Sequence, residues 1–573
     1  MTTSDDAQAA ADEAAAAAQV AVEAHAAAAA AQQKADDLAA VAVASSIPSN
    51  AGQDVVAIVQ AGYAFEGPAV EIGALVDGDA IPEAQVRIPL GMLNRHGLIA
   101  GATGTGKTKT LQVFAEQVSA HGVPVFAADI KGDLSGIAVS GTSSDKLATR
   151  CQSIGQTWNP QASPTELFTL GGMGTGVPIR ASVTSFGPTL LAKVLGLNGT
   201  QESSLGLVFH YAKNANLELI DLADLRAVLV HLTSDDGKAE LKELGGLSSA
   251  TVGVILRELI AFGDDGADVF FGRPEIDVAD FLRTTSDGPE GVRGIISLLE
   301  VPGVQEKPAL FSTFLMYLLQ QLFRTLPEVG DTEKPTLVFF FDEAHLLFRD
   351  ASKDFLETIT QTVRLIRSKG VGVVFVTQTP KDVPADVLAQ LGSRVQHQLR
   401  AHTPNDAKAL KATVSTYPTS TYDLGEVLQQ LAIGEAIVTV MNDKGAPTPV
   451  AWTRVRAPQG SMDPAPDDQM QATVAASSLL AKYGTAVDPE SAAEKLGKVA
   501  VAADVATAAE TQKQWEQEEA SRVAKEADRI AQQRGRSAPK RRSTSRRTST
   551  LDKPVGEASR TFAREIVKKL FKR

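Results

Sequence analysis

The chain has 573 residues, too many for one compact domain, and 44% of them are hydrophobic, which is enough for a substantial core. Its formal net charge of −13 argues against a protein that coats nucleic acid with its whole surface. The single cysteine excludes an intramolecular disulfide framework. Because the start lacks a signal peptide and no long, strongly apolar segment follows, we expect a soluble cytoplasmic protein.

Two segments precede the main body of the chain. Residues 1–48 are an alanine-rich arm, predicted to be helical because alanine is the best helix former. The arm is either a solvated helix or weak coiled coil, or an oligomerisation element. Residues 49–92 carry short alternating apolar and polar runs broken by glycine and proline, which predicts a small β module.

The main body is predicted to be an α/β core in two parts, residues 93–180 and 331–458. Its short, nearly continuous apolar runs, such as "VPVFAADI" and "VGVVFVTQ", indicate strands buried on both faces. Such strands are typical of a mainly parallel sheet covered by helices. Residues 181–330 show helical periodicity and are predicted to be a large helical insertion in this core.

The chain beyond residue 458 changes in composition. Residues 459–489 read as a linker, and 490–533, rich in Ala, Glu, Lys and Gln, as a helix or coiled coil. Residues 534–573 contain 14 Lys or Arg against three Asp or Glu, which makes a basic tail of about +11 on an acidic body. Within it, 559–573 predicts an amphipathic helix that would lie on anionic lipid, dock on a protein partner, or pack on its own chain.

One glycine-rich stretch after an apolar run has a recognisable pattern. It follows G-x-x-x-x-G-K-[ST] and consists of Gly101, Ala102, Thr103, Gly104, Thr105, Gly106, Lys107 and Thr108. Glycines allow successive N–H groups to turn inward around a phosphate, and the following helix adds its dipole. Lys107 is expected to reach the β- and γ-phosphates of ATP, and the Thr108 hydroxyl to bind Mg²⁺.

A second signal is the apolar run "TLVFFF", which ends at two carboxylates. Burial of an unpaired charge is costly, so Asp342 and Glu343 need a function at this strand end or a role in capping the next helix. Asp342 can hold Mg²⁺ beside the phosphates, and Glu343 can act as the general base that activates water. Together with the glycine-rich loop, this pair predicts ATP hydrolysis.

Several other polar residues are weaker candidates. Gln378 ends another apolar strand and is expected to sense the γ-phosphate, unless it only satisfies loop backbone. One arginine, supplied across a subunit boundary, is expected to stabilise phosphate charge; Arg367 and Arg400 are the preferred candidates, with ordinary surface ion pairs as the alternative. The segment "ADIKGDL" places Asp129, Lys131 and Asp133 at a sheet end, as part of the site or as a self-paired turn. The other candidate arginines are Arg364 and Arg394.

The stretches "HGLIAGATGTGKTKTLQVFAEQ", "GVPVFAADIKGDLSG", "LVFFFDEAHLLF" and "RLIRSKGVGVVFVTQ" resemble the HerA/FtsK class of P-loop ATPases. The resemblance runs from about residue 52 to 458 and is strongest to the YjgR-like branch, the helicase HerA-like C-terminal domain family. It implies a RecA-type core with an additional strand beside the P-loop strand, use of ATP and Mg²⁺, and a ring, commonly hexameric. It also implies the same roles for Asp342, Glu343 and Gln378. The short β module and the large insertion depart from true HerA proteins.

Two functions follow from these observations. The first is a ring-forming ATPase motor on DNA, for which the basic tail would neutralise phosphates, although such a tail can also be merely solvated. The second is an ATPase switch or remodelling scaffold that acts on a protein partner or at a membrane surface through 559–573.

Overall fold

The computed structural model describes residues 54–498, apart from 235–236, 244–247, 265, 287–290, 302–307, 349–352 and 443, together with 513–522 and 525. The alanine-rich arm, the basic tail and the terminal amphipathic helix predicted above lie outside the described residues. The chain divides into two units, Met1–Gly497 and Lys498–Arg573. In the second unit, residues 513–522 form an exposed helix, which falls within the predicted helical segment 490–533; the following paragraphs concern the first unit.

A twelve-stranded sheet runs through the first unit in the order β2-β1-β14-β13-β12-β3-β11-β10-β4-β9-β5-β6. The strands from β12 to β6 run parallel, and the four at the other edge run antiparallel. The strands of this sheet are β1 (Ala69–Asp77), β2 (Asp79–Pro89), β3 (Gly97–Ala100), β4 (Val125–Asp129), β5 (Thr165–Leu170), β6 (Val177–Ile179), β9 (Ile296–Glu300), β10 (Leu337–Phe341), β11 (Val371–Thr377), β12 (Ser393–Gln396), β13 (Glu435–Thr439) and β14 (Ala451–Val455).

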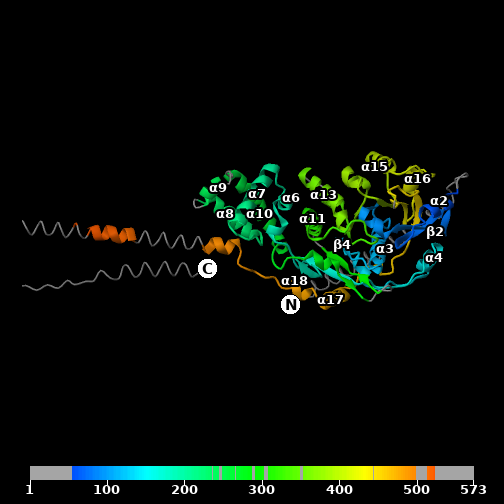
Figure 1. Cartoon of the computed structure of the whole chain (residues 1–573), viewed down its shortest axis with the longest axis horizontal. Coiled ribbons are helices and arrows are strands. Elements are labelled where there is room, and N and C mark those ends of the chain that lie inside the picture. The colour runs from blue at the N-terminus through cyan, green and yellow to red at the C-terminus, as the bar shows by residue number, and fades with distance from the viewer. Residues whose placement is uncertain are drawn as a thin grey trace, which may run out of the picture. The chain divides into compact units, whose positions relative to one another are not determined.

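Helices cover this sheet and extend from it (Figure 1). None of the described helices has the length and apolarity required to cross a lipid bilayer. The helices are α2 (Val55–Gly62), α3 (Lys107–Ala120), α4 (Asp145–Ser153), α5 (Val183–Phe186), α6 (Pro188–Val194), α7 (Gly199–Asn214), α8 (Leu222–Thr233), α9 (Lys238–Glu243), α10 (Ser249–Asp264), α11 (Pro308–Thr325), α12 (His345–Phe348), α13 (Lys353–Ile366), α14 (Ala385–Leu388), α15 (Pro404–Val414), α16 (Leu424–Gln430), α17 (Asp467–Ala476) and α18 (Leu480–Tyr483).

The central strands are apolar on both faces because both faces are covered. Every residue of β4, β10 and β11 is buried, and two hydrophobic clusters lie on opposite faces of the sheet. Strand β11 lies between β3, which leads into the glycine-rich loop, and β10, which ends in the two carboxylates. This arrangement confirms the predicted α/β fold with an additional strand beside the P-loop strand.

The segment predicted as a separate β module is part of the main sheet. Strands β1 and β2 form a hairpin around Gly78, whose φ of 78° lies in the left-handed region that glycine adopts at low cost. Strand β1 then pairs with β14, so residues 69–89 form the antiparallel edge of the sheet. A local alternation of apolar and polar residues predicts strands, but it contains no information about a pairing partner almost 380 positions away.

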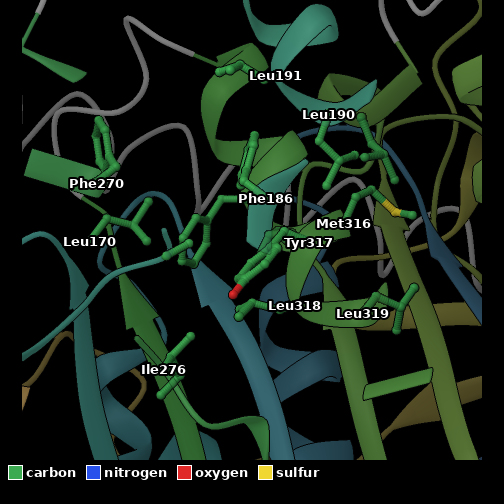
Figure 2. Packing of buried hydrophobic residues seen from close by; sticks show 14 of the residues in the cluster. Leu170, Phe186, Leu190, Leu191, Phe270, Ile276, Met316, Tyr317, Leu318 and Leu319 are labelled. Atoms are coloured by element: carbon green, nitrogen blue, oxygen red, sulfur yellow. The ribbon is translucent and has the colours of Figure 1, made fainter. Parts of the chain in front are cut away.

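The predicted insertion at 181–330 is helical only in part. Helices α7 to α10 pack on one another, but β9 re-enters the main sheet between β4 and β5, and a short hairpin, β7 (Thr284–Thr285) with β8 (Arg293–Gly294), precedes it. Aromatic packing joins this segment to the core, because the rings of Phe281 and of Phe126 on β4 have centroids 4.8 Å apart, and it also joins helices within the segment. Figure 2 shows Phe186 of α5 beside Tyr317 of α11, with their ring centroids 5.6 Å apart.

Residues 456–466, which we call the strap, are packed on the core, although most of them fall in the segment predicted as a linker. The Glu116 carboxylate on α3 accepts hydrogen bonds from the N–H groups of Gln459 and Gly460, at 2.7 and 2.9 Å. Burial raises the pKa of Glu116 to about 7. The strap therefore binds the helix that follows the glycine-rich loop, and helices α17 and α18 continue from it.

Candidate nucleotide site

The glycine-rich loop connects the end of β3 to the start of α3. Gly104 and Gly106 have φ values of 81° and 109°, which glycine adopts at low cost. At Gly101 the constraint is space, because a Cβ there would lie 2.5 Å from the Cβ of His397. Glycine is therefore favoured at Gly104 and Gly106 by the backbone angle, and at Gly101 by the close approach of His397.

Lys107 is the first residue of α3, where helical N–H groups have no carbonyl partner one turn earlier. Its Nζ lies 3.1 Å from the carbonyl oxygen of Ala102, so the side chain folds back over the loop. Burial lowers the pKa of Lys107, and the charges of Glu343 and Asp342 oppose that change. The Lys107 ammonium therefore lies within electrostatic range of both carboxylates.

Two residues that are not among the predicted site residues, the buried His397 and the partly buried Gly434, support the loop. His397 contacts the Thr110 hydroxyl through Nε2 at 2.9 Å and the carbonyl oxygen of Glu435 through Nδ1 at 2.8 Å. Gly434 donates its N–H to the carbonyl oxygen of Thr105 at 3.0 Å. Burial lowers the pKa of His397 to about 4, so the imidazole is neutral at physiological pH. In the sequence, the only sign of this support is a histidine directly after the residues that form β12.

The two carboxylates follow β10 in different environments. Glu343 adopts a φ of 47°, unusual for a residue with a side chain, and its N–H donates to Oδ1 of Asp342 at 2.8 Å. Contacts with His345 and Lys131 hold the pKa of Glu343 near 2, whereas burial and the neighbouring Glu343 charge raise that of Asp342 to about 7. A cation bound to Asp342 would favour its ionised form.

The oxygen ligands at this site suit magnesium. No group of three or more His, Cys, Asp or Glu side chains within the described residues is arranged to bind a metal unaided. Mg²⁺ ordinarily needs only one or two protein oxygens, because waters and substrate phosphates complete its shell. The Thr108 hydroxyl at the start of α3 and the Asp342 carboxylate at the end of β10 are donors of this kind.

The other predicted site residues are spread more widely. Gln378 follows β11 and is exposed, next to Thr377, whose carbonyl oxygen accepts the Gly101 N–H at 3.2 Å. The Arg400 guanidinium lies 3.4 Å from the Thr103 carbonyl oxygen, on the loop of its own chain. Arg367 pairs with Asp331 at 2.9 Å and directly precedes β11. It therefore lies at the amino-terminal ends of the parallel strands, whereas the P-loop lies at their carboxyl ends.

The remaining arginine candidates lie away from the loop. Arg394 donates to the Thr416 hydroxyl at 2.7 Å, and Arg364 is exposed on α13.

The turn after β4 is built around Asp129. Its carboxylate accepts hydrogen bonds from the N–H groups of Lys131, Gly132 and Leu134, at 3.2, 2.7 and 2.7 Å. The segment therefore forms the self-paired turn that was one predicted alternative. It also places Lys131 against Glu343, which agrees with the other alternative, a role in the site. The adjacent strand β9 ends in Glu300, which is 3% exposed.

Glu300 gives a prediction about stability and pH. Burial raises the pKa of Glu300 to about 8, helped by the charges of Asp129 and Asp133. The folded protein therefore binds a proton more tightly than the unfolded chain, so the free energy of unfolding falls as pH rises from about 4.5 to 8. Glu300→Gln removes this titration and is expected to stabilise the protein by about 1–3 kcal/mol at pH 8.

Thermal unfolding measured between pH 5 and 8.5 checks this expectation. The exposed Glu66, replaced by Gln, provides the matched control and should retain the slope of the unaltered chain. Equal slopes for Glu300→Gln and Glu66→Gln would show that Glu300 is ionised in the folded protein.

A mainly parallel sheet, an additional strand between the loop strand and the carboxylate strand, and a P-loop at the start of α3 define a RecA-like P-loop NTPase fold. The chain belongs to the Helicase HerA-like C-terminal family, which it matches over residues 75–573.

Individual proteins are more distant. "Probable helicase MJECL08" of Methanocaldococcus jannaschii is 24% identical over 364 residues, which cover 61% of this chain and 64% of that protein. The conjugative coupling protein TrwB, solved as TrwBdeltaN70, is 16% identical with a TM-score of 0.47, over 71% of this chain and 93% of that one. VirB4 of Thermoanaerobacter pseudethanolicus is 14% identical with a TM-score of 0.45, over 69% and 98% respectively.

Proposed function

We propose that this chain is a magnesium-dependent ATPase that forms a ring and moves along DNA. The observation that supports it best is the strand order: β3 ends at the P-loop that leads to Lys107, β10 ends at Asp342 and Glu343, and only β11 separates these two parallel strands. Membership of the Helicase HerA-like C-terminal family supports the same class of activity. A likeness to a probable helicase supports a nucleic acid as the polymer.

In the proposed reaction, the N–H groups of the P-loop and the Lys107 ammonium bind the β- and γ-phosphates of ATP. Thr108 and Asp342 would hold Mg²⁺, which neutralises developing phosphate charge when bound. Glu343 accepts the proton of the attacking water, and Gln378 senses the γ-phosphate. Arg400 already contacts its own loop, so we propose Arg367 as the better candidate for an arginine supplied by a neighbouring subunit.

An ATPase assay with and without DNA tests the proposal on the full chain. We expect DNA to stimulate turnover several-fold at low salt, and this stimulation to decline steeply as salt rises, because phosphate contacts release counterions. Native mass spectrometry with ATP should show a closed oligomer, for which we propose six subunits. If the rate of ATP hydrolysis is unchanged by DNA but rises with anionic liposomes or with a protein partner, the result would instead favour the remodelling function.

A further inference from the structure

Lys131 contacts the proposed general base directly. Its Nζ lies 2.5 Å from Oε1 of Glu343, while Nδ1 of His345 lies 3.3 Å from Oε2 of the same carboxylate. The Glu343 side chain is 10% exposed, whereas that of Lys131 is 48% exposed. Glu343 is therefore held between two side chains, and the lysine is the partner with room to move.

The position of Lys131 is set by a rigid turn. The Asp129 carboxylate accepts hydrogen bonds from the N–H groups of Lys131, Gly132 and Leu134, and β4 pairs directly with β10 in parallel register. The carboxyl ends of neighbouring parallel strands lie side by side. The turn after β4 therefore places the Lys131 ammonium beside the Asp342–Glu343 pair that follows β10. Only the flexible side chain, not the backbone, has to move for Lys131 to change partners.

The Lys107 and Lys131 ammonium groups both lie within electrostatic range of the same two carboxylates. The charge of Lys131 acts on Lys107, and both are balanced by Glu343 and Asp342. Lys107 reaches over the P-loop, where β- and γ-phosphates bind, whereas Lys131 approaches from the side of the water-activating carboxylate. In the reaction proposed above, a cation beside the water-activating carboxylate would face the terminal phosphate, because that phosphate is the one that water attacks.

We propose that Lys131 is a ligand of the γ-phosphate that is kept on Glu343 until a triphosphate binds. This inference rests on the proposed ATPase function. When the γ-phosphate arrives, the Lys131 ammonium leaves Glu343 for a γ-phosphate oxygen, and the carboxylate becomes free to act as a base. Water then attacks the γ-phosphorus, its proton passes to Glu343, and the bond to the β-phosphate oxygen breaks, with its electron pair leaving on ADP.

The test compares Lys131→Met with Lys131→Arg and with Lys411→Met, an exposed lysine on α15 that serves as the matched control. Affinities for Mg-ADP and for a non-hydrolysable Mg-ATP analogue are measured by equilibrium titration, and kcat by steady-state hydrolysis. For Lys131→Met we expect unchanged ADP affinity, a preference for the analogue over ADP reduced at least about tenfold, and kcat reduced at least about tenfold. Lys131→Arg should recover part of both, and Lys411→Met should match the unaltered chain.

Retained ADP binding shows that each variant is folded. An unchanged preference for the analogue over ADP in Lys131→Met would overturn the proposal. A rise in kcat with that preference unchanged would overturn it as well, because it would show that Lys131 only restrains Glu343. If the ATPase proposal itself is wrong, the unaltered chain will not hydrolyse ATP. The ratio of the affinities for the ATP analogue and ADP would still show whether Lys131 binds the γ-phosphate.

Discussion

Replacing Lys107 by alanine is expected to abolish ATP turnover and to weaken ATP binding strongly. The Lys107 side chain folds over the P-loop and interacts with the charges of Glu343 and Asp342, so its loss leaves two carboxylates facing the phosphates without this cation. One preorganised charged donor at a developing phosphate charge is worth about 10²–10³-fold in kcat. We expect a loss of at least that size, measured by phosphate release at saturating ATP.

The neighbouring Lys109 is a demanding control for this experiment. It lies on the same helix two residues later, and its Nζ contacts Oε1 of Gln112 at 3.5 Å, outside the loop. Lys109→Ala should therefore retain most of the activity that Lys107→Ala loses. Equal ATP affinity in the Lys107→Ala variant and the unaltered chain would contradict the P-loop assignment.

Glu343→Gln is expected to separate binding from hydrolysis. Glutamine keeps the shape of the side chain but cannot accept the proton of water, and loss of a general base ordinarily costs about 10²–10⁴-fold in kcat. Lys107, Thr108 and the loop N–H groups remain, so ATP should bind and persist on the protein. Retention of labelled ATP after gel filtration, together with single-turnover kinetics, measures both quantities.

The half-exposed Lys131 can turn to water when its carboxylate partner is replaced, so we expect Glu343→Gln to fold normally. Asp342→Asn provides the contrast, because it alters the proposed magnesium ligand and should weaken the magnesium dependence of ATP binding. Rapid multiple turnover by Glu343→Gln would refute the role of Glu343 as the base.

The sequence predicts the fold best where short patterns determine the backbone. Apolar runs of five to seven residues identify β10 and β11 because both faces of these strands are buried. Local patterns place strand β1 in a separate module because its partner β14 is remote in sequence. Strand β9 was missed within the insertion for the same reason, since it re-enters the sheet between β4 and β5.

The strap illustrates how composition can mislead. Proline, glycine and acidic residues favour a linker reading for 459–489, yet Glu116 and Gln112 bind the strap's backbone, with Gln112 donating to the Ser461 carbonyl oxygen at 3.0 Å. Every residue carries backbone N–H and C=O groups, apart from the missing N–H of proline. The sequence of the strap therefore does not indicate that its backbone binds Glu116 and Gln112.

By itself, the sequence determined the phosphate loop, the strand-end carboxylates and the α/β class, because each depends on residues adjacent in the chain. The tertiary structure alone decided which residues meet across the sheet: Lys131 pairs with Glu343, His397 packs against Gly101, and Arg400 contacts the Thr103 carbonyl oxygen in the P-loop of its own chain. These contacts join residues about 210 to 300 positions apart, and only the order and register of the strands bring them together.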